Sequence, residues 1–558
     1  MKLNTKRTIL VGFAFFLICA FWQAYDGIVP LMLVNKFGMN QTWSGLIMAL
    51  DNILALFMLP LFGTLSDKSK SKYGKRTPYI VIGTVVAVVC FLGLTFADNA
   101  QLKKIEEGTT ETFWSANYQV ANAEYDSFGN KDVPENYTVQ DYTAHILYNK
   151  DYAQLTTEEQ TAAHNWYVSK LDNQTKYSFD RTSDLYSYND AQTYEGHTYN
   201  AFTAVVSSAR SQFASQVTQG QVYVLVIFIV LLLGTLIAMA TFRSPAVALM
   251  PDVTIKPLRS KANAIINLMG TAGAMLVLGL GMVFGTGSVK NQIMSYTTFV
   301  GAVCGIMIVA LLVFVLTVKE KKWNTEMLEQ QASIDAENDK QTEGETQQAT
   351  TEKLPKEKLK SLVLILASVA LWFIGYNAIT SKYSLYAVNV LDKDYNTTLL
   401  IAQAAAIVSY VPVGIIASKI GRKKSILIGV ALLTAAFTGA IFVTRSTPTV
   451  VIWILFALAG IAWATINVNS FPMVVELSQG GNIGKYTGYY YTASMAAQIV
   501  TPILSGAIMD WIGNMSPLFP YGAVFVAMSF VTMLFVKYGD NKPQAPKDKL
   551  EMLAGADD

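Results

Sequence analysis

The chain has 558 residues, of which 52% are hydrophobic and only 15% are charged, with a mean hydropathy of +0.33. A soluble protein of this size carries about 25% charged residues, so the composition indicates a membrane protein. The net charge of +2 gives no support for binding to nucleic acid, and we expect no such partner. The three cysteines, Cys19, Cys90 and Cys304, lie in apolar runs at unrelated spacings, which is typical of small core residues and not of disulfides or metal sites.

Twelve apolar stretches are long enough to cross a bilayer, which requires about 20 mainly apolar residues for each helix. In chain order they are residues 8–33, 43–65, 78–97, 221–250, 262–285, 299–318, 362–383, 398–418, 425–443, 450–475, 487–511 and 521–536. The first stretch is too long, and too polar at its outer end, to be a cleaved signal peptide. We therefore expect an all-α membrane protein with twelve transmembrane helices.

The basic residues are distributed unevenly between the two sides of these helices. If both termini are cytoplasmic, the inner segments hold 28 of the 42 Lys and Arg residues, and the short outer loops and helix ends hold five: Lys36, Lys290, Lys382, Lys393 and Arg445. Cytoplasmic loops carry such an excess of positive charge. We expect a multi-pass protein of the plasma membrane with both termini cytoplasmic, surrounded by lipid. Lys382 is close enough to the outer surface for its amine to reach water.

An internal duplication divides the chain into two halves. The segment Gly63-x-x-x-Asp67-Lys68 returns 351 residues later as Gly414-x-x-x-Ser418-Lys419, and the same offset aligns Tyr25-Asp26 with Tyr376-Asn377. We expect one six-helix bundle in residues 1–97 and 221–318 and a second in residues 361–537. Residues 319–360 form a polar cytoplasmic linker that is partly helical, and residues 538–558 a cytoplasmic tail. Two membrane-embedded halves facing each other describe a transporter, which we expect to be monomeric.

We expect residues 98–220 to be a large insert between the third and fourth helices, on the extracellular side by the topology above. The insert holds 17 acidic and 8 basic residues, many tyrosines and all three histidines, His145, His164 and His197. Its aromatic content indicates a small folded module. We find no metal-ligand spacing, nucleophile elbow or paired catalytic carboxylates in it, and expect neither an enzyme nor a cofactor. The alternative is that the insert makes the protein a receptor or a surface enzyme.

Three ionisable residues lie inside the expected transmembrane helices, where such residues are costly and are usually functional. They are Asp26 in the first helix, Asp51 in the second and Arg243 in the fourth, and their counterparts in the second half are neutral: Asn377, Ala402 and Ser470. We hypothesise that Asp26 binds and releases the coupling proton, with Asp51 as a second carboxylate or relay. A carboxylate that alternately meets and loses Arg243 changes its affinity for protons. The alternatives are a fixed Asp26–Arg243 ion pair, and a hydrogen-bonded Asp51 at a helix contact.

Amide and aromatic side chains are frequent at membrane depth, where an amide that has no function is costly. Amides bind sugar hydroxyls and aromatic faces stack on sugar rings, so these residues are candidates for a substrate site. They are Trp22, Gln23, Tyr25, Asn52, Asn263, Asn267, Trp372, Tyr376, Asn377, Gln403, Asn467, Tyr490 and Gln498. Asn263 and Asn267 are four residues apart and share a helix face. The alternative for each aromatic residue is packing in the core or a place in the interfacial belt.

The pattern Gly63-x-x-x-Asp67-Lys68 followed by Gly74-Lys75-Arg76 resembles the signature loop of the major facilitator superfamily. The longer strings Leu65–Ile80 and Arg243–Asp252 are similar to the sucrose–proton symporter group and to the glycoside–pentoside–hexuronide:cation symporters. The resemblance implies a fold of two pseudo-symmetric six-helix bundles and transport of a sugar with a cation. These carriers place acids in the first two helices and a cation in the fourth. The sodium-using branch has a second acid one turn along the second helix, where this chain has Ala55, which favours protons.

The same loop is a candidate for a conformational latch. A carboxylate at Asp67 can accept hydrogen bonds from the amino end of a neighbouring helix or from a cation, which would close the inner side in the outward-facing state. The other candidate residues of the latch are Gly63, Lys68, Arg76, Asp252 and Arg259. The alternative is that these charges are solvated loop residues. Ser418 replaces the acid in the second copy, so we expect a weaker latch there.

We therefore expect a symporter that imports a di- or oligosaccharide with protons by alternating access. A drug–proton antiporter of the same superfamily is one alternative, although such exporters commonly have a Gly-Pro pair in the fifth helix and the segment Leu268–Gly273 has none. A lipid or lysolipid carrier is another, although it would favour a more apolar cavity.

Overall fold

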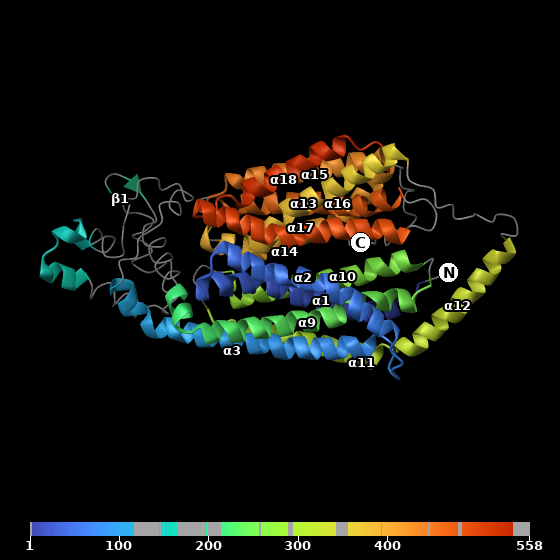
Figure 1. The fold of residues 1–558 in the computed structure, drawn as a ribbon, viewed down its shortest axis with the longest axis horizontal. Helices are drawn as coiled ribbons and strands as arrows, with labels where there is room; N and C mark the ends of the chain where they lie inside the picture. The colour runs from blue at the N-terminus through green and yellow to red at the C-terminus, as the bar shows by residue number, and fades with distance from the viewer. Residues whose placement is uncertain are drawn as a thin grey trace.

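The structure is a computed structural model. It describes residues 3–115, 144, 147–148, 150–163, 193–194, 197–198, 214–255, 258–287, 294–341, 355–391, 393–444, 447–477 and 483–539. Figure 1 shows two bundles of long helices lying side by side, with the described pieces of the insert at one end and the linker helix α12 at the other. We call these two ends the insert end and the linker end.

The amino-terminal bundle is formed by the helices that precede the linker. They are α1 (Thr5–Leu31), which continues as the π-helix η1 (Met32–Lys36), α2 (Gln41–Asp67), α3 (Thr77–Ser115), α9 (Val222–Val253), α10 (Arg259–Phe284) and α11 (Thr297–Thr317). Helix α1 packs along α10, and α3 packs along α9. The chain starts at the linker end (Figure 1).

The carboxy-terminal bundle follows the linker helix α12 (Glu320–Gln341). It contains α13 (Lys356–Asn389), α14 (Tyr395–Ile420), α15 (Arg422–Ile441), α16 (Thr449–Val475), α17 (Ile483–Ile512) and α18 (Leu518–Leu534). The two bundles meet where α2 packs against α17, α10 against α14 and α1 against α13. These three contacts enclose the space between the bundles.

Ten helices in the described residues are long and apolar enough to cross a membrane. An eleventh is counted if α14 is one span, since it bends by 50° between Tyr410 and Pro412, and proline is a common cause of such a bend. Helix α18 has 17 residues, fewer than the roughly 20 of a typical span. Each of the twelve expected stretches falls mainly within one helix, but twelve crossings stay a prediction.

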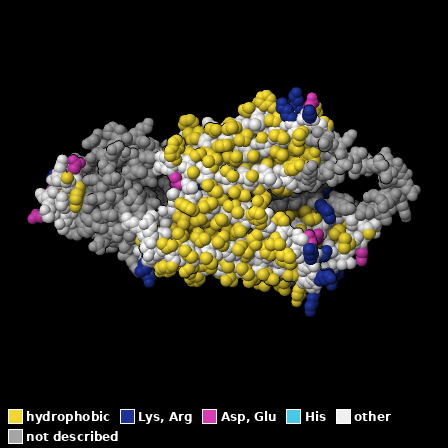
Figure 2. Space-filling model, in the orientation of Figure 1, with side chains coloured by type: hydrophobic (Ala, Val, Ile, Leu, Met, Phe, Trp, Pro, Cys, Tyr) yellow, Lys and Arg dark blue, Asp and Glu magenta, His cyan; other side chains and the backbone are white. Residues whose placement is uncertain are grey.

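Apolar side chains cover the middle of the molecule, and Lys and Arg gather near the linker end in Figure 2. A belt of this kind is typical of a surface that faces lipid, and charged residues at the end of the belt are typical of a membrane boundary. The distribution agrees with a multi-pass membrane protein. The assignment of the linker end to the cytoplasm stays a prediction.

The third helix is longer than expected. Helix α3 continues beyond residue 97 to Ser115, so the boundary expected at Asp98 lies within a helix. A buried ion pair explains part of this: Lys36 Nζ donates a 2.5 Å hydrogen bond to Asp98, and both side chains are 0% exposed. A buried charge needs such a partner, and the pair fixes the end of η1 to the start of the extension.

Of the expected insert, only pieces are described. They include the 3-10 helix η2 (Tyr152–Gln154) and two short antiparallel strands, β1 (Thr193–Tyr194) and β2 (His197–Thr198), so the described chain is not purely helical. His145 and His164 lie outside the described residues, as does most of the expected tail. The expected small folded module therefore stays a prediction.

Candidate transport site

A cavity of about 1360 Å³ lies between the two bundles and is lined by residues of both. Its wall includes Asp26 of α1, Arg243 of α9 and Asn267 of α10 on one side, and Tyr376 of α13 and Gln403 of α14 on the other. The cavity extends to Gly63 and Asp67 at the linker end, where the Asp67 side chain is 62% exposed. The cavity is therefore open to the linker end.

The insert end is closed by contacts between the bundles. The hydroxyls of Thr286 in the amino-terminal bundle and Tyr395 in α14 lie 3.0 Å apart, and Asn396 Nδ2 donates a 3.0 Å hydrogen bond to Thr286. Asn35 and Asn389 donate to each other through their side-chain amides, at 3.3 and 2.8 Å. Among the described residues, these bonds join the two bundles on the insert side of the cavity.

Asp26 is exposed although it lies within the apolar helix α1, because its side chain faces the cavity. Its neighbours Phe21 and Tyr25 are 0% exposed and stack with ring centroids 5.9 Å apart. The aromatic residues hold one face of α1 in the core, and a helix turns about 100° per residue, so Asp26 points elsewhere. The structure thus places this predicted coupling residue in contact with the cavity.

Arg243 lines the same cavity, with its guanidinium carbon 5.7 Å from the centroid of the Trp22 ring. The ion pairs of the described residues include none between Arg243 and Asp26 or Asp51 in this state, and the alternative of a fixed Asp26–Arg243 pair stays untested. Asp51 is half-buried, does not line the cavity, and accepts a 2.7 Å hydrogen bond from Asn52 Nδ2. The structure brings Asp26 and Arg243 to one cavity and leaves Asp51 beside it.

Two amides cross the gap between the bundles inside the cavity. Gln403 Nε2 donates a 2.8 Å hydrogen bond to Gln23 Oε1, while the buried Gln403 Oε1 has no partner among the described residues. The buried Nδ2 of Asn267, which also lines the cavity, likewise has no partner there. Unpaired buried polar atoms are rare in folded proteins. A bound solute that both donates and accepts hydrogen bonds would satisfy the two.

The carboxy-terminal bundle presents a flat aromatic surface to the cavity. Tyr376 stacks on Trp463 with ring centroids 3.5 Å apart and planes inclined by 4°, and both line the cavity. Trp463 was not among the expected residues, because it stands in an apolar run of α16 with nothing local to distinguish it from a core residue. The role of Trp463 becomes visible only in its contact with Tyr376, where α13 packs against α16.

Of the expected substrate residues not yet described, all but Asn263 lie off the wall of the cavity. Tyr25 and Trp372 are 0% exposed, and the Tyr490 hydroxyl lies 2.9 Å from that of Ser470. Trp22, Asn52, Asn377, Asn467 and Gln498 also lie off its wall. Asn263 lines the wall, as do Thr271, Tyr383, Tyr410 and Tyr491, which sequence reasoning missed.

The expected latch residues form a network around Arg76, which is 6% exposed. Its guanidinium donates to Asp67, to Asp252 at 2.8 Å and to Ser66 at 2.5 Å. Burial lowers the pKa of Arg76, but the hydrogen bond to Asp252 and the charges of Asp252 and Asp67 outweigh it and raise the pKa. Arg76, and not a neighbouring helix, is thus the partner of Asp67 in this state.

The other latch candidates lie around this network. Lys68 is exposed, and Arg259 donates to the carbonyls of Pro251 and Thr254 at 3.0 and 3.2 Å and not to Asp252. In the second copy the Ser418 hydroxyl donates to the carbonyl of Ile415, while Arg422 pairs with Glu476. The second half therefore has an ion pair of its own, although Ser418 replaces the acid.

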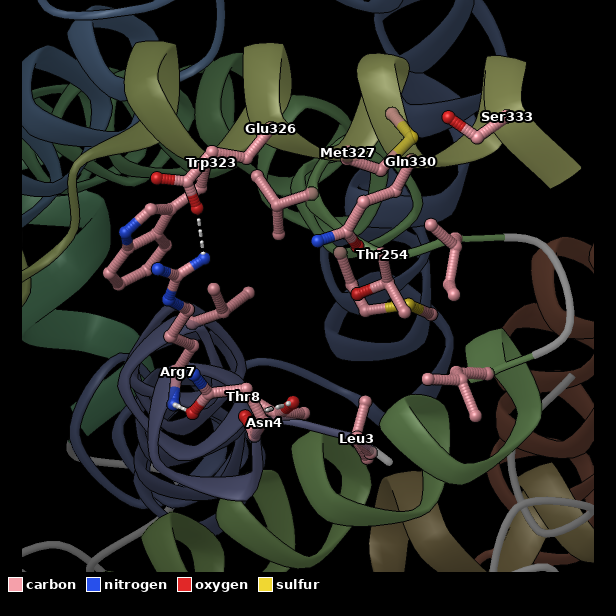
Figure 3. A pocket seen from close by; sticks show the side chains of 15 residues that line it. Leu3, Asn4, Arg7, Thr8, Thr254, Trp323, Glu326, Met327, Gln330 and Ser333 are labelled. Atoms are coloured by element: carbon pink, nitrogen blue, oxygen red, sulfur yellow. Dashed lines mark hydrogen bonds and ion pairs between the residues drawn. The ribbon is translucent and has the colours of Figure 1, made fainter. Parts of the chain in front are cut away.

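The linker helix α12 contacts the amino-terminal bundle through polar bonds. Glu320 accepts hydrogen bonds from the backbone amides of Arg76 and Thr77, at 2.9 and 2.8 Å, and so caps the amino end of α3. A second cavity of about 650 Å³ lies between α12 and the start of α1 (Figure 3). There Arg7 donates to Glu326 at 2.5 Å and lies 5.2 Å from the Trp323 ring centroid.

Comparison with known families gives two matches. Residues 201–480 and 394–555 match the family described as Major Facilitator Superfamily, which together is more than half of the chain. Residues 11–105 match the family described as MFS/sugar transport protein. The second match covers Asp26 and the Asp67–Arg76 loop.

Two curated relatives match shorter parts of the chain. An uncharacterized MFS-type transporter of Methanocaldococcus jannaschii is 29% identical over 127 residues, 23% of this chain and 30% of the relative. Sucrose transport protein SUC4 of Arabidopsis thaliana is 40% identical over 52 residues, 9% of this chain and 10% of the relative. The matched part therefore spans less than a third of either relative.

Solved structures resemble the whole chain. The xylose transporter XylE from E. coli, in an inward open conformation, has a TM-score of 0.56 and 11% identity, with 99% of each chain covered. A peptide transporter POT in complex with sulfate has a TM-score of 0.52 and 9% identity, with 95% of this chain and 93% of that chain covered. These likenesses establish a shared fold.

Proposed function

The chain belongs to the Major Facilitator Superfamily, and we propose that it is a secondary transporter that carries a glycoside together with a proton across the plasma membrane. The substrate is a di- or oligosaccharide, and transport proceeds by alternating access of one central site. The match of residues 11–105 to MFS/sugar transport proteins and the short match to a sucrose transport protein support a sugar.

The chemistry of the cavity supports a neutral polyhydroxy substrate. Its wall combines the stacked rings of Tyr376 and Trp463 with the amides of Gln403 and Asn267, each of which has a buried polar atom without a partner in the described part of the chain. A sugar ring has an apolar face for the rings and hydroxyls that both donate and accept hydrogen bonds for the amides. A cavity of about 1360 Å³ has room for more than one sugar ring.

The observation on which the proposal depends is the position of Asp26. It is a carboxylate inside an apolar helix long enough to span a membrane, exposed to the cavity and unpaired with Arg243 among the described residues in this state. An ionisable residue at that depth is retained for a function. We infer that Asp26 takes up the coupling proton and that closure towards the other state brings Arg243 close enough to favour its release. Asp51, which lies beside the cavity and not on its wall, is the second carboxylate of the proposed proton site.

In this proposal the linker end faces the cytoplasm, and the structure is the inward-facing state. The gathering of Lys and Arg near this end supports that orientation (Figure 2). Counterflow of labelled glycosides in proteoliposomes, with and without an imposed pH gradient, tests the function. The proposal is supported if a labelled glycoside exchanges without a pH gradient and accumulates against its concentration gradient when the outside is acidic. Failure to exchange any member of a broad panel of glycosides contradicts it.

A further inference from the structure

The first turn of α2 is capped by a carboxylate from the other half of the protein. Asp510, near the carboxyl end of α17, accepts hydrogen bonds from the backbone amides of Gln41 and Thr42, at 2.8 and 2.7 Å, and from the Thr42 hydroxyl. The first amides of a helix have no partner within the helix and carry its positive end. A negative charge supplied by the opposite bundle therefore stabilises their contact.

A buried lysine reinforces this contact. Lys382 of α13 donates to the backbone carbonyl of Gln41 at 2.9 Å and to its side-chain oxygen at 3.2 Å. The residue is 3% exposed, so the expectation that its amine reaches water at the outer surface is wrong. A cation inside a membrane helix needs polar partners, and these two are supplied by the other half.

The backbones of α2 and α17 touch at the same place. A side-chain carbon at Gly45 would lie 2.0 Å from the carbonyl oxygen of Pro502, and one at Gly506 would lie 2.3 Å from that of Gln41. Real contacts of this kind are never so short, so each position requires glycine while the insert end is closed. The close approach keeps the Asp510 carboxylate within reach of the α2 amides.

The two helices run in opposite directions, so each amino end lies beside the other helix's carboxyl end. Helix α2 begins at the insert end with Gln41 and finishes at the linker end with Asp67, whereas α17 begins at Ile483 and finishes at Ile512. Both carry a carboxylate near their carboxyl ends, Asp67 and Asp510. In this state Asp510 binds α2, while Asp67 lies on the wall of the open cavity.

We propose that Asp510 and Lys382 are positioning residues for transport, which hold the insert end closed by binding the first turn of α2 across the interface between the halves. Opening of the insert end breaks these bonds and leaves Lys382 without the Gln41 oxygens. The energy of the bonds thus favours the state that is open to the linker end. The proposal rests on alternating access, and on neither the identity of the sugar nor that of the cation.

Distances between spin labels measure this directly in the substrate-free, full-length protein. Trp43 of α2 and Trp511 of α17 are 59% and 86% exposed near the insert end, and each is replaced by a labelled cysteine after Cys19, Cys90 and Cys304 are removed. Electron–electron resonance then gives the populations with α2 and α17 close or apart. We expect Asp510→Asn to raise the ratio of apart to close about tenfold, since the charged cap of α2 is lost.

Asn40→Ala is the matched control, because Asn40 caps α2 from within its own half by accepting from the Trp43 amide at 2.9 Å. That bond is independent of the interface, so we expect the Asn40→Ala ratio to equal that of the parent. Lys382→Met is an independent second variant and shifts the ratio in the same direction as Asp510→Asn. The proposal is overturned if Asp510→Asn and Lys382→Met both leave the ratio of apart to close unchanged. It is also overturned if Asn40→Ala shifts this ratio as much as they do. No transport assay enters these readouts, so a failed symport test leaves them standing.

Discussion

The side-chain amide of Gln403 in α14 donates a 2.8 Å hydrogen bond to Gln23 in α1 and so joins the two halves of the protein inside the cavity. The second polar atom of Gln403, its Oε1, is buried and has no partner among the described residues. A substrate bound here would touch both halves at once. A substrate favours closure of the two halves around itself only if it contacts both of them.

Gln403→Leu tests this contact. The substitution preserves the size of the side chain but removes its hydrogen bonds, and one such bond contributes about 0.5–1.5 kcal/mol. We expect KM for the best glycoside to rise about tenfold, with a smaller change in the maximal rate of counterflow. Gln498→Leu, on α17 and away from the cavity wall, serves as the control. An effect of Gln498→Leu as large as that of Gln403→Leu would show that the loss reflects general damage to the bundle.

The aromatic surface predicts a different pattern of substitutions. Tyr376→Ala removes the ring that stacks on Trp463, and aromatic contacts of this kind contribute about 0.5–1.5 kcal/mol beyond area burial. We expect binding of the glycoside to weaken about fivefold to tenfold in Tyr376→Ala and to change little in Tyr376→Phe, measured by counterflow or calorimetry. Equal losses in both variants would assign the role to the hydroxyl and not to the ring.

The Arg76 network predicts an effect on stability. Arg76→Ala leaves Asp252 and Asp67 without their cation. We expect the free energy of unfolding to fall by about 3 kcal/mol, which is near the low end for breaking a buried ion pair. The value is low because both carboxylates are partly exposed. Thermal unfolding of the purified protein in detergent measures this. Lys68→Ala, one residue from Asp67 but exposed, should unfold at the parent temperature. Equal unfolding temperatures for Arg76→Ala and the parent would contradict the assigned role.

Much of the fold follows from the sequence, because apolar length is sufficient to place a helix in a bilayer. The expected stretches for α1, α9 and α10 lie close to the observed helices. The continuation of α3 past Ala97 does not follow, since Asp98 there pairs with Lys36, which is distant in the sequence. Asp98 is a polar residue that favours a loop locally, but its buried bond to Lys36 keeps it within the helix.

The wall of the cavity is harder to predict than the helices. Tyr25 and Asp26 are neighbours at the same depth, yet one is fully buried and the other faces the cavity. The difference depends on the rotation of α1 against its neighbours, which a single sequence does not contain. Trp463 shows the same limit, because only its contact with Tyr376 in another helix distinguishes it from core residues.

The central claim is that titration of Asp26 drives accumulation of the substrate, and Asp26→Asn tests it in proteoliposomes. The amide has nearly the shape of the carboxyl group but binds no proton, so we expect counterflow without a gradient to persist. Under an imposed pH gradient the parent should accumulate labelled glycoside several-fold above equilibrium, and Asp26→Asn should stop at a ratio of about one. Accumulation by Asp26→Asn that matches the parent, with the same dependence on pH, would contradict the claim.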